Sequence, residues 1–523
     1  MISQSARRWL VGITSTGVMM LGYLGANNAV AAPNTFCTSG TTVYSGGSGG
    51  QWGTGDNWTH GQPSAQCRAV IPANITVTLS TVTQPGTYGN GSTGTAEGLT
   101  LMAQSRLIVE GVSSDVQGNE SNGTNLVVGA GGLTIDRGAS LDLNATGKTQ
   151  PGSPPHYKAG GSANVTVSSG SSSSANLINL GSISASSTDP SWGESINVAG
   201  VFTNKGMVTV KSGLLVLQGQ QIPYVLRNDG RFVVDTPASV SMIAGDGSSL
   251  TNSGTFTNRG ATTLHQSMMW RQVGGGEFGH PVTLAGNETL QDSAGPAAFE
   301  INNCTVANLT GRVAIHQIIT VVGGCSGTTL NLGTGSNKAP VTNNGVIVLN
   351  APAHGSSAII SGAPLINHGV LVSSVSPTVK ASNQVLTPLT NSSGGTVDVQ
   401  SGVLAQTTGS TTTNNGTVII GSSASWLLQS GVFSNHGTLS LHLQSATKFG
   451  ALNLTTGGVF NAGGQLVPTL SPGYHPRLGT EFAIVTMNGG RPEGHFSSVA
   501  PAFRVDYSKE SSATPYLGVI FRG

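Results

Sequence analysis

Two short stretches decide the fold: VTNNGVIVL at residues 341–349 and LINHGVLVS at residues 365–373. Each contains an Asn, a variable residue and a Gly, followed by alternating apolar residues, and the two Asn residues are 24 positions apart. Asn and Gly tolerate left-handed backbone angles, so the Asn-x-Gly unit predicts a bend. The alternation that follows predicts a strand with one buried face.

The same unit recurs along most of the chain, with some looser copies near the end. We expect a ladder of turn residues at Asn179, Asn204, Asn228, Asn252, Asn343, Asn367, Asn391, Asn414 and Asn435. The steps are 25, 24 and 24 in the first set and 24, 24, 23 and 21 in the second. Such regularity is typical of repeat architectures.

We therefore predict an all-β fold, a right-handed parallel β-helix with about 24 residues per coil. Coils of this kind stack about 4.8 Å apart, so inward apolar side chains form columns and the Asn side chains can form a hydrogen-bonded ladder. An array of antiparallel hairpins is the alternative, because Asn-Gly is also a hairpin signal. Its turns would recur about every 8–12 residues, a shorter step than the one observed.

The composition limits the possible partners. Charged residues make up 8% of the 523 residues and the net charge is +1, against about 25% charged residues in ordinary globular domains. A nucleic-acid-binding protein would show a basic stripe, so no nucleic-acid partner is expected. No spacing of ligand residues indicates a metal ion or a cofactor.

The first residues have the features of an export signal. Arg7 and Arg8 precede an apolar run of about 16 residues, and Ala29-Val30-Ala31 supplies the small residues of a cleavage site. We expect a signal peptide over residues 1–31, cleaved near Ala31, and a secreted or cell-surface protein. No later stretch approaches the roughly 18 apolar residues of a membrane span, so the mature chain should contain no transmembrane helix.

The four cysteines are Cys37, Cys67, Cys304 and Cys325. An even number in an exported chain predicts two disulfides. Cys304 and Cys325 are 21 residues apart, close to one coil, so we expect them on adjacent coils. Stacked strands bring Cα atoms within the distance range of a disulfide.

Both ends of the chain resemble a known class of protein. The segment Gly50-Gln51-Trp52-Gly53-Thr54-Gly55-Asp56-Asn57-Trp58, followed by Gly61-Gln62-Pro63, is similar to the start of bacterial secreted β-helix proteins. Leu470-Ser471-Pro472-Gly473 and Gly494-His495-Phe496 resemble the end of the same proteins. These are autotransporter passenger domains and adhesins. The resemblance implies a passenger-like protein here, without the C-terminal barrel, whose segments of about 10 residues are not seen.

We expect Trp52 and Trp58 to cap the open end of the apolar column, which would otherwise expose strand edges. The expected organisation follows the repeats. It comprises a signal peptide (1–31), an N-terminal cap segment (32–98), a β-helix (99–465) with a Gly/Ser/Pro-rich insertion at about 146–174, and C-terminal closing strands (466–523).

Catalytic motifs are not evident. Glycoside hydrolysis needs two carboxylates about 5–9.5 Å apart, and the 21 acidic residues are scattered. Acids on stacked coils, such as Asp229 with Glu277 or Asp398 with a neighbour, could still meet in space. The sequence thus favours a structural or adhesive protein that binds glycans or a cell surface through an extended polar wall, with no catalytic residue assigned. The alternative is a polysaccharide lyase or hydrolase whose site is assembled across coils.

Overall fold

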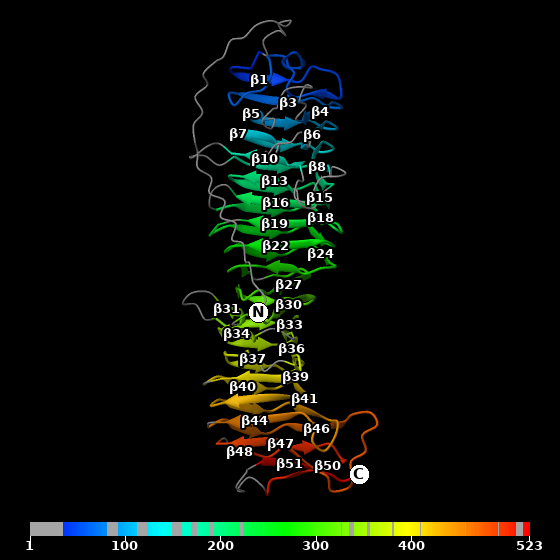
Figure 1. The fold of residues 1–523 in the computed structure, drawn as a ribbon. Helices are drawn as coiled ribbons and strands as arrows, with labels where there is room; N and C mark the ends of the chain where they lie inside the picture. The colour runs from blue at the N-terminus through cyan, green and yellow to red at the C-terminus, as the bar shows by residue number, and fades with distance from the viewer. Residues whose placement is uncertain are drawn as a thin grey trace, which may run out of the picture. The chain divides into compact units, whose positions relative to one another are not determined.

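The computed structural model describes residues 35–80, 93–111, 123–148, 159–168, 175–188, 193–219, 223–243, 245–291, 293–325, 327–333, 339–352, 356–378, 381–407, 409–455, 457–489, 491–508 and 516–523. The expected signal peptide and its cleavage site near Ala31 lie outside these residues. The described chain is a parallel β-helix, because strands of successive coils pair in parallel almost throughout (Figure 1). Each full coil contributes one strand to each of three columns.

The first and second columns join into one sheet, because four long strands cross the corner between them. These strands are β5 (Thr93–Leu101), β7 (Thr124–Ile135), β39 (Thr396–Gln406) and β41 (Thr417–Gln429). The other first-column strands are β10 (Ala163–Val167), β13 (Gly193–Val198), β16 (Leu214–Gly219), β19 (Ser239–Ile243), β22 (Ala261–His265), β25 (Val282–Leu284), β27 (Ala297–Ile301), β30 (Gln317–Val322), β33 (Val346–Ala351), β36 (Val370–Val375), β43 (Thr438–Leu443), β46 (Gln465–Leu470) and β49 (Ser498–Val499).

The second column begins with the first strand of the chain. Its remaining strands are β1 (Gly40–Val43), β3 (Cys67–Ile71), β11 (Leu177–Asn179), β14 (Val201–Asn204), β17 (Val225–Asn228), β20 (Ser249–Asn252), β23 (Met269–Gln272), β26 (Thr289–Leu290), β28 (Val306–Leu309), β31 (Thr328–Leu332), β34 (Ala358–Gly362), β37 (Ser382–Val385), β44 (Ala451–Thr455) and β47 (Glu481–Asn488).

The third column consists of two separate sheets. The N-terminal sheet contains β2 (Gly50–Gln51), β4 (Thr76–Ser80), β6 (Arg106–Gly111), β8 (Ser140–Lys148), β12 (Ser182–Ser187), β15 (Met207–Ser212), β18 (Arg231–Val234), β21 (Thr255–Asn258) and β24 (Gly275–Phe278). The C-terminal sheet contains β29 (Arg312–Val313), β32 (Val341–Asn343), β35 (Leu365–Asn367), β38 (Leu389–Asn391), β40 (Thr411–Asn414), β42 (Val432–Asn435), β45 (Val459–Ala462) and β48 (Arg491–Gly494).

Side chains alternate between the inside and the outside of the coil, as the period of two predicts. On β33, Ile347 and Leu349 are fully buried, whereas Val346 and Val348 lie on the outer face. The buried apolar residues form one continuous core along the described coils. Phe232 and Phe256 on adjacent coils stack with their ring centroids 5.2 Å apart. Each coil therefore buries its apolar face against its neighbours.

The repeated Asn residues form two hydrogen-bonded ladders rather than one. In each ladder, the side-chain Nδ2 of one Asn donates to the Oδ1 of the Asn one coil further on. The first ladder joins Asn179, Asn204, Asn228 and Asn252, and the second joins Asn343, Asn367, Asn391, Asn414 and Asn435. All of these side chains are buried. The Nδ2 groups also donate to backbone carbonyls of the adjacent coil, for example from Asn367 to Thr396 at 3.0 Å.

The two ladders occupy different corners of the coil. Asn204 ends β14, so the first ladder lies at the corner between the second and third columns. Asn367 ends β35, so the second ladder lies at the corner between the third and first columns. Asn258 ends β21, so it already lies at this second corner, upstream of the second ladder. The repeat in the sequence is therefore weak between Asn258 and Asn343 because the ladder of Asn residues changes from the first corner to the second in this segment.

The Gly of the Asn-x-Gly unit has a different role from the one predicted. Gly206, Gly230 and Gly369 do not have positive φ angles. A Cβ atom on Gly206 would instead lie 2.0 Å from the carbonyl oxygen of Gly181 in the adjacent coil. Glycine is needed here because the backbones of successive turns approach closely.

The N-terminal end is closed by aromatic rings. Trp52 and Trp58 are 0% and 4% exposed and pack edge to face, with centroids 5.0 Å apart. The Nε1 of Trp58 donates to the carbonyl of Trp52 at 3.0 Å. The Trp52 indole lies beside Gly94, an inward position of β5, where a Cβ would come 3.0 Å from Trp52 Nε1. The rings thus cover the start of the first column.

Two expected boundaries differ from the structure. Parallel pairing already begins with β1 and β3, so the first coils lie inside the segment expected to be only a cap. Part of the expected insertion at 146–174 is regular strand: β10 pairs with β7 and β13, because Ala163, Val165 and Val167 alternate into the core. β9 (Ala159–Gly161) pairs antiparallel with the end of β8.

The C-terminal end is closed by antiparallel strands. β51 (Tyr516–Phe521) pairs with β47 and with β50 (Phe503–Asp506). These antiparallel pairs satisfy backbone N–H and C=O groups at the end of the β-helix that would otherwise be free to pair with another parallel coil. Among the described residues the one short helix, the 3-10 turn η1 (Gly55–Asn57), precedes Trp58 near the other end.

Both cysteine pairs form disulfides. Cys37 is bonded to Cys67 with a Cα–Cα distance of 6.1 Å. Cys304 is bonded to Cys325 with a Cα–Cα distance of 5.6 Å. Cys304 lies in the turn between β27 and β28, and Cys325 in the turn between β30 and β31. The second disulfide therefore joins adjacent coils.

We predict that Trp58→Ala opens the N-terminal coils. Truncating a buried Trp typically costs about 3–5 kcal/mol, and the variant also loses the hydrogen bond to the Trp52 carbonyl. Coils in a solenoid are supported mainly by their neighbours. Limited proteolysis should show new cleavage before residue 150 and an intact fragment beyond Asn179. Phe36→Ala, which alters an aromatic side chain that is 57% exposed, is the control. An unchanged digest of Trp58→Ala would contradict the cap.

We predict that Asn391→Ala locally weakens the second ladder. Asn391 accepts from Asn367 at 2.8 Å and donates to Asn414 at 2.7 Å, so the substitution leaves buried polar partners unpaired. Each such group costs about 1–3 kcal/mol. Hydrogen exchange measured by mass spectrometry should become faster in β38 and β40. Thr390→Ala, on the outer face of the same strand, should leave exchange unchanged. Equal protection in both variants would refute a stabilising ladder.

Candidate functional site

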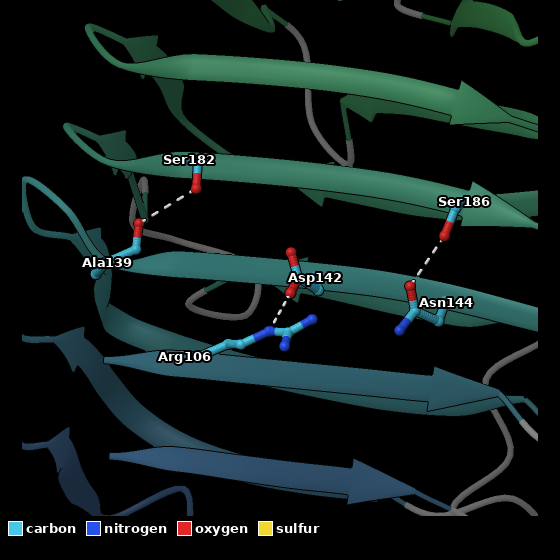
Figure 2. A network of polar contacts seen from close by, with 6 residues as sticks. All are labelled: Arg106, Ala139, Asp142, Asn144, Ser182 and Ser186. Carbon is cyan, nitrogen blue, oxygen red and sulfur yellow. Dashed lines mark hydrogen bonds and ion pairs between the residues drawn. The ribbon is translucent and has the colours of Figure 1, made fainter. Parts of the chain in front are cut away.

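The outer face of the N-terminal sheet of the third column carries a network of polar side chains on β6, β8 and β12, which we call the polar wall. Figure 2 shows Arg106, Asp142, Asn144, Ser182 and Ser186 of this wall across three coils. The Nε of Arg106 donates to the Asp142 carboxylate. The Ser186 hydroxyl donates to Asn144 Oδ1 at 3.0 Å, and the Ser182 hydroxyl to the carbonyl of Ala139 at 3.4 Å. The wall thus holds hydroxyl and amide groups in fixed positions.

The polar wall exists because parallel register places equivalent residues above one another. Ser182, Ser184 and Ser186 of β12 lie opposite Ser140, Asp142 and Asn144 of β8. Strands stack about 4.8 Å apart, so outward side chains repeat at that spacing. The inward neighbours Leu141 and Ile183 fix the strands from inside.

Similar ladders appear on the other two columns. On the first column, Asn164 donates to Asn125 Oδ1 at 3.0 Å and accepts from the Ser195 hydroxyl at 2.7 Å. On the second column, Asn331 donates to Asn308 Oδ1 at 2.9 Å. Outward amide and hydroxyl groups in several successive coils are therefore a general feature of the surface.

Glu277 and Asp398, two of the acidic side chains considered from the sequence, have other partners among the described residues. The Arg259 guanidinium contacts Glu277 at 3.0 Å and Asp235 at 3.6 Å. Glu277 is therefore paired with an arginine and not with Asp229, the partner considered from the sequence. Asp398 accepts from the Gln400 side-chain amide at 2.9 Å. Within the described residues, no group of three or more His, Cys, Asp and Glu side chains is placed to hold a metal ion.

Two buried carboxyl groups were missed by the sequence analysis. Glu194 on β13 and Glu288 just before β26 are both 0% exposed. One oxygen of Glu194 accepts from the Ala145 N–H at 3.4 Å, and one oxygen of Glu288 accepts from the Gly286 N–H at 2.9 Å. The second oxygen of each carboxyl has no hydrogen-bond partner.

Burial raises the pKa of Glu194 and the pKa of Glu288, each to about 7, against the opposing effect of backbone N–H groups. Four coil steps of about 4.8 Å each separate Glu194 from Glu288, so the two carboxyl groups are too far apart to act as a catalytic pair. Glu194 shares the inward phase of β13 with Ile196 and Val198, and that alternation was the signal in the sequence that could have identified it.

The residues singled out from the sequence do not converge on one site. The Asn ladders lie inside two corners, the Trp cap lies at one end, and the disulfides link neighbouring segments. Their roles in the structure are contacts within and between coils. No family model, curated protein or solved structure matches this chain. The described residues contain no helix with the length and apolar character needed to span a membrane.

We predict that Glu194 makes stability depend on pH. The folded state raises the pKa of Glu194 to about 7 from an ordinary value of 4.5, so folding favours the protonated carboxyl. Its full contribution is present below about pH 4.5 and is lost as the pH rises through 7. At 1.36 kcal/mol per pKa unit, the free energy of unfolding falls by on the order of 3 kcal/mol over this pH range.

Glu194→Gln should therefore flatten the fall in melting temperature between pH 4.5 and pH 8. The amide keeps the size of the carboxyl and does not ionise. Glu277→Gln, which alters a glutamate on the surface, is the matched control and should retain the wild-type pH profile. A wild-type profile in Glu194→Gln would show that this carboxyl does not control the pH dependence.

Proposed function

We propose that this chain is a secreted or surface-associated structural protein that adheres to glycans through its polar wall. The observation that carries the proposal is the register of β8 on β12, which aligns outward hydroxyl, amide and carboxylate groups over successive coils. Glycans present hydroxyl groups along a chain, so they offer matching donors and acceptors. Each contact is weak, and the binding free energy comes from many contacts made together.

The charge distribution also supports adhesion to neutral surfaces. The net charge is +1 and only 8% of residues are charged. In the wall itself, Arg106 and Asp142 neutralise each other. A wall with little net charge has no strong attraction for polyanions.

Export is part of the proposal. Two disulfides are typical of oxidising compartments, and the structure has both. The expected signal peptide adds to this argument from the sequence. The resemblance of the chain ends to autotransporter passengers and adhesins also favours a surface role.

We predict that the mature protein co-sediments with insoluble neutral polysaccharides such as cellulose. The triple variant Asn144→Ala/Ser184→Ala/Ser186→Ala should bind about tenfold more weakly, because it removes three hydrogen-bonding groups of about 0.5 kcal/mol each. Neither protein should release reducing ends from the polymer.

The matched control is Val346→Ala/Val348→Ala/Val370→Ala, on the apolar outer face of β33 and β36. It should bind as the wild type does. Equal binding by both triple variants would reject the polar wall as the contact surface. Binding to fixed bacterial cells but not to any polysaccharide would indicate a protein or lipid partner, and sustained release of sugar ends would favour the polysaccharide-cleaving alternative.

A further inference from the structure

A recess lies at the corner between the first and second columns, beside β22 and β25. The turn from β22 to β23 has only three residues, 266–268, whereas the adjacent turns span 244–248 and 285–288. A short turn between two longer ones leaves a hollow on the outer surface. Its volume is about 480 Å³, and it is lined by Ile243, His265, Gln266, Ser267, Ala285, Gly286 and Asn287.

The lining is polar but carries no Lys, Arg, Asp or Glu. Gln266 and Asn287 offer amide donors and acceptors, and Ser267 offers a hydroxyl. Burial lowers the pKa of His265, so its half-buried imidazole is neutral at physiological pH. Ile243 and Ala285 add methyl groups. This mixture suits an uncharged ligand that has both hydroxyl groups and apolar C–H faces.

A buried carboxyl group lies behind the lining of the recess. The Glu288 side chain is fully buried directly behind Gly286, and its Oε1 has no hydrogen-bond partner. A Cβ on Gly286 would lie 2.9 Å from this oxygen and 2.9 Å from the backbone nitrogen of Gln266. The glycine therefore leaves only a thin layer of backbone between the recess and an unpaired carboxyl oxygen that can accept a hydrogen bond.

We propose that this recess binds a single ring, or a short end, of a neutral sugar. Its volume falls in the range of about 300–1,000 Å³ found for small-molecule sites. His265, Gln266 and Asn287 bind the hydroxyl groups, and Ile243 packs against the C–H face of the ring. The proposal rests on the proposed function for the source of the sugar, but it assigns a discrete site on a different face from the polar wall.

Saturation-transfer difference NMR on the mature protein tests this site with three soluble probes. These are methyl β-glucoside, which is neutral, glucuronate, which is anionic, and glucosamine, which is cationic. We expect a signal from the neutral probe and weaker signals from the charged ones. His265→Ala should weaken binding of methyl β-glucoside about fivefold, the effect of losing one hydrogen bond.

Thr263→Ala is the matched control, because Thr263 lies two residues earlier on β22, on the same outer face but outside the lining. It should bind as the wild type does, and both variants should keep the wild-type melting temperature. Ala285→Phe, which fills the recess, should abolish the signal. The absence of a signal from methyl β-glucoside, equal signals from the charged probes, or undiminished binding by both His265→Ala and Ala285→Phe would overturn the proposal.

Failure of this site is distinguishable from failure of the proposed function. His265→Ala should still co-sediment with cellulose through the polar wall. Retained co-sedimentation without soluble-sugar binding would reject the recess alone. Soluble-sugar binding without co-sedimentation would support the recess and reject adhesion through the wall.

Discussion

Stacking of one coil on the next is the interaction on which the rest of this structure depends. A single coil cannot bury its apolar face, because its inward side chains contact mainly those of the coils above and below. The corners impose a further requirement, because buried backbone N–H and C=O groups in tight turns need hydrogen-bond partners. The Asn ladders meet it: each buried amide bonds to the next amide and to the backbone of the adjacent coil, as Asn367 does to Asn391 and to the Thr396 carbonyl.

The repeat was predictable because those amides must recur once per coil. The Asn-x-Gly step therefore indicated the parallel β-helix, and the alternation around Val346–Leu349 indicated which side chains enter the core. The corner that each ladder occupies was not predictable, because Asn204 and Asn367 sit in the same local pattern while ending strands of different columns. The reason for the glycine in the Asn-x-Gly unit was not predictable from the sequence either, because the close approach of Gly206 to the Gly181 carbonyl is a contact between coils.

The candidate sites were less predictable than the fold. The polar wall depends on the register of β8 on β12, and register is a property of pairing between segments about 42 residues apart. The recess depends on the difference in length between three successive turns, which no motif encodes. Glu288 gives no warning in the sequence because it precedes a strand of only two residues. An inward acid such as Glu194 is visible only once the phase of its strand is known.

Several irregular features lie between the regular parts of the two ladders. Leu264 lies opposite Leu284, and Leu284 opposite Ile301, so these coils contain 20 and 17 residues instead of about 24. The third column is divided between β24 and β29 in the same stretch. The Cys304–Cys325 disulfide joins adjacent coils in this stretch. The three-residue turn after β22 lies between two longer turns and forms the recess beside Glu288. The recess therefore lies beside the segment where the repeat is interrupted, whereas the polar wall lies on β6, β8 and β12, where successive coils contain 34 and 42 residues.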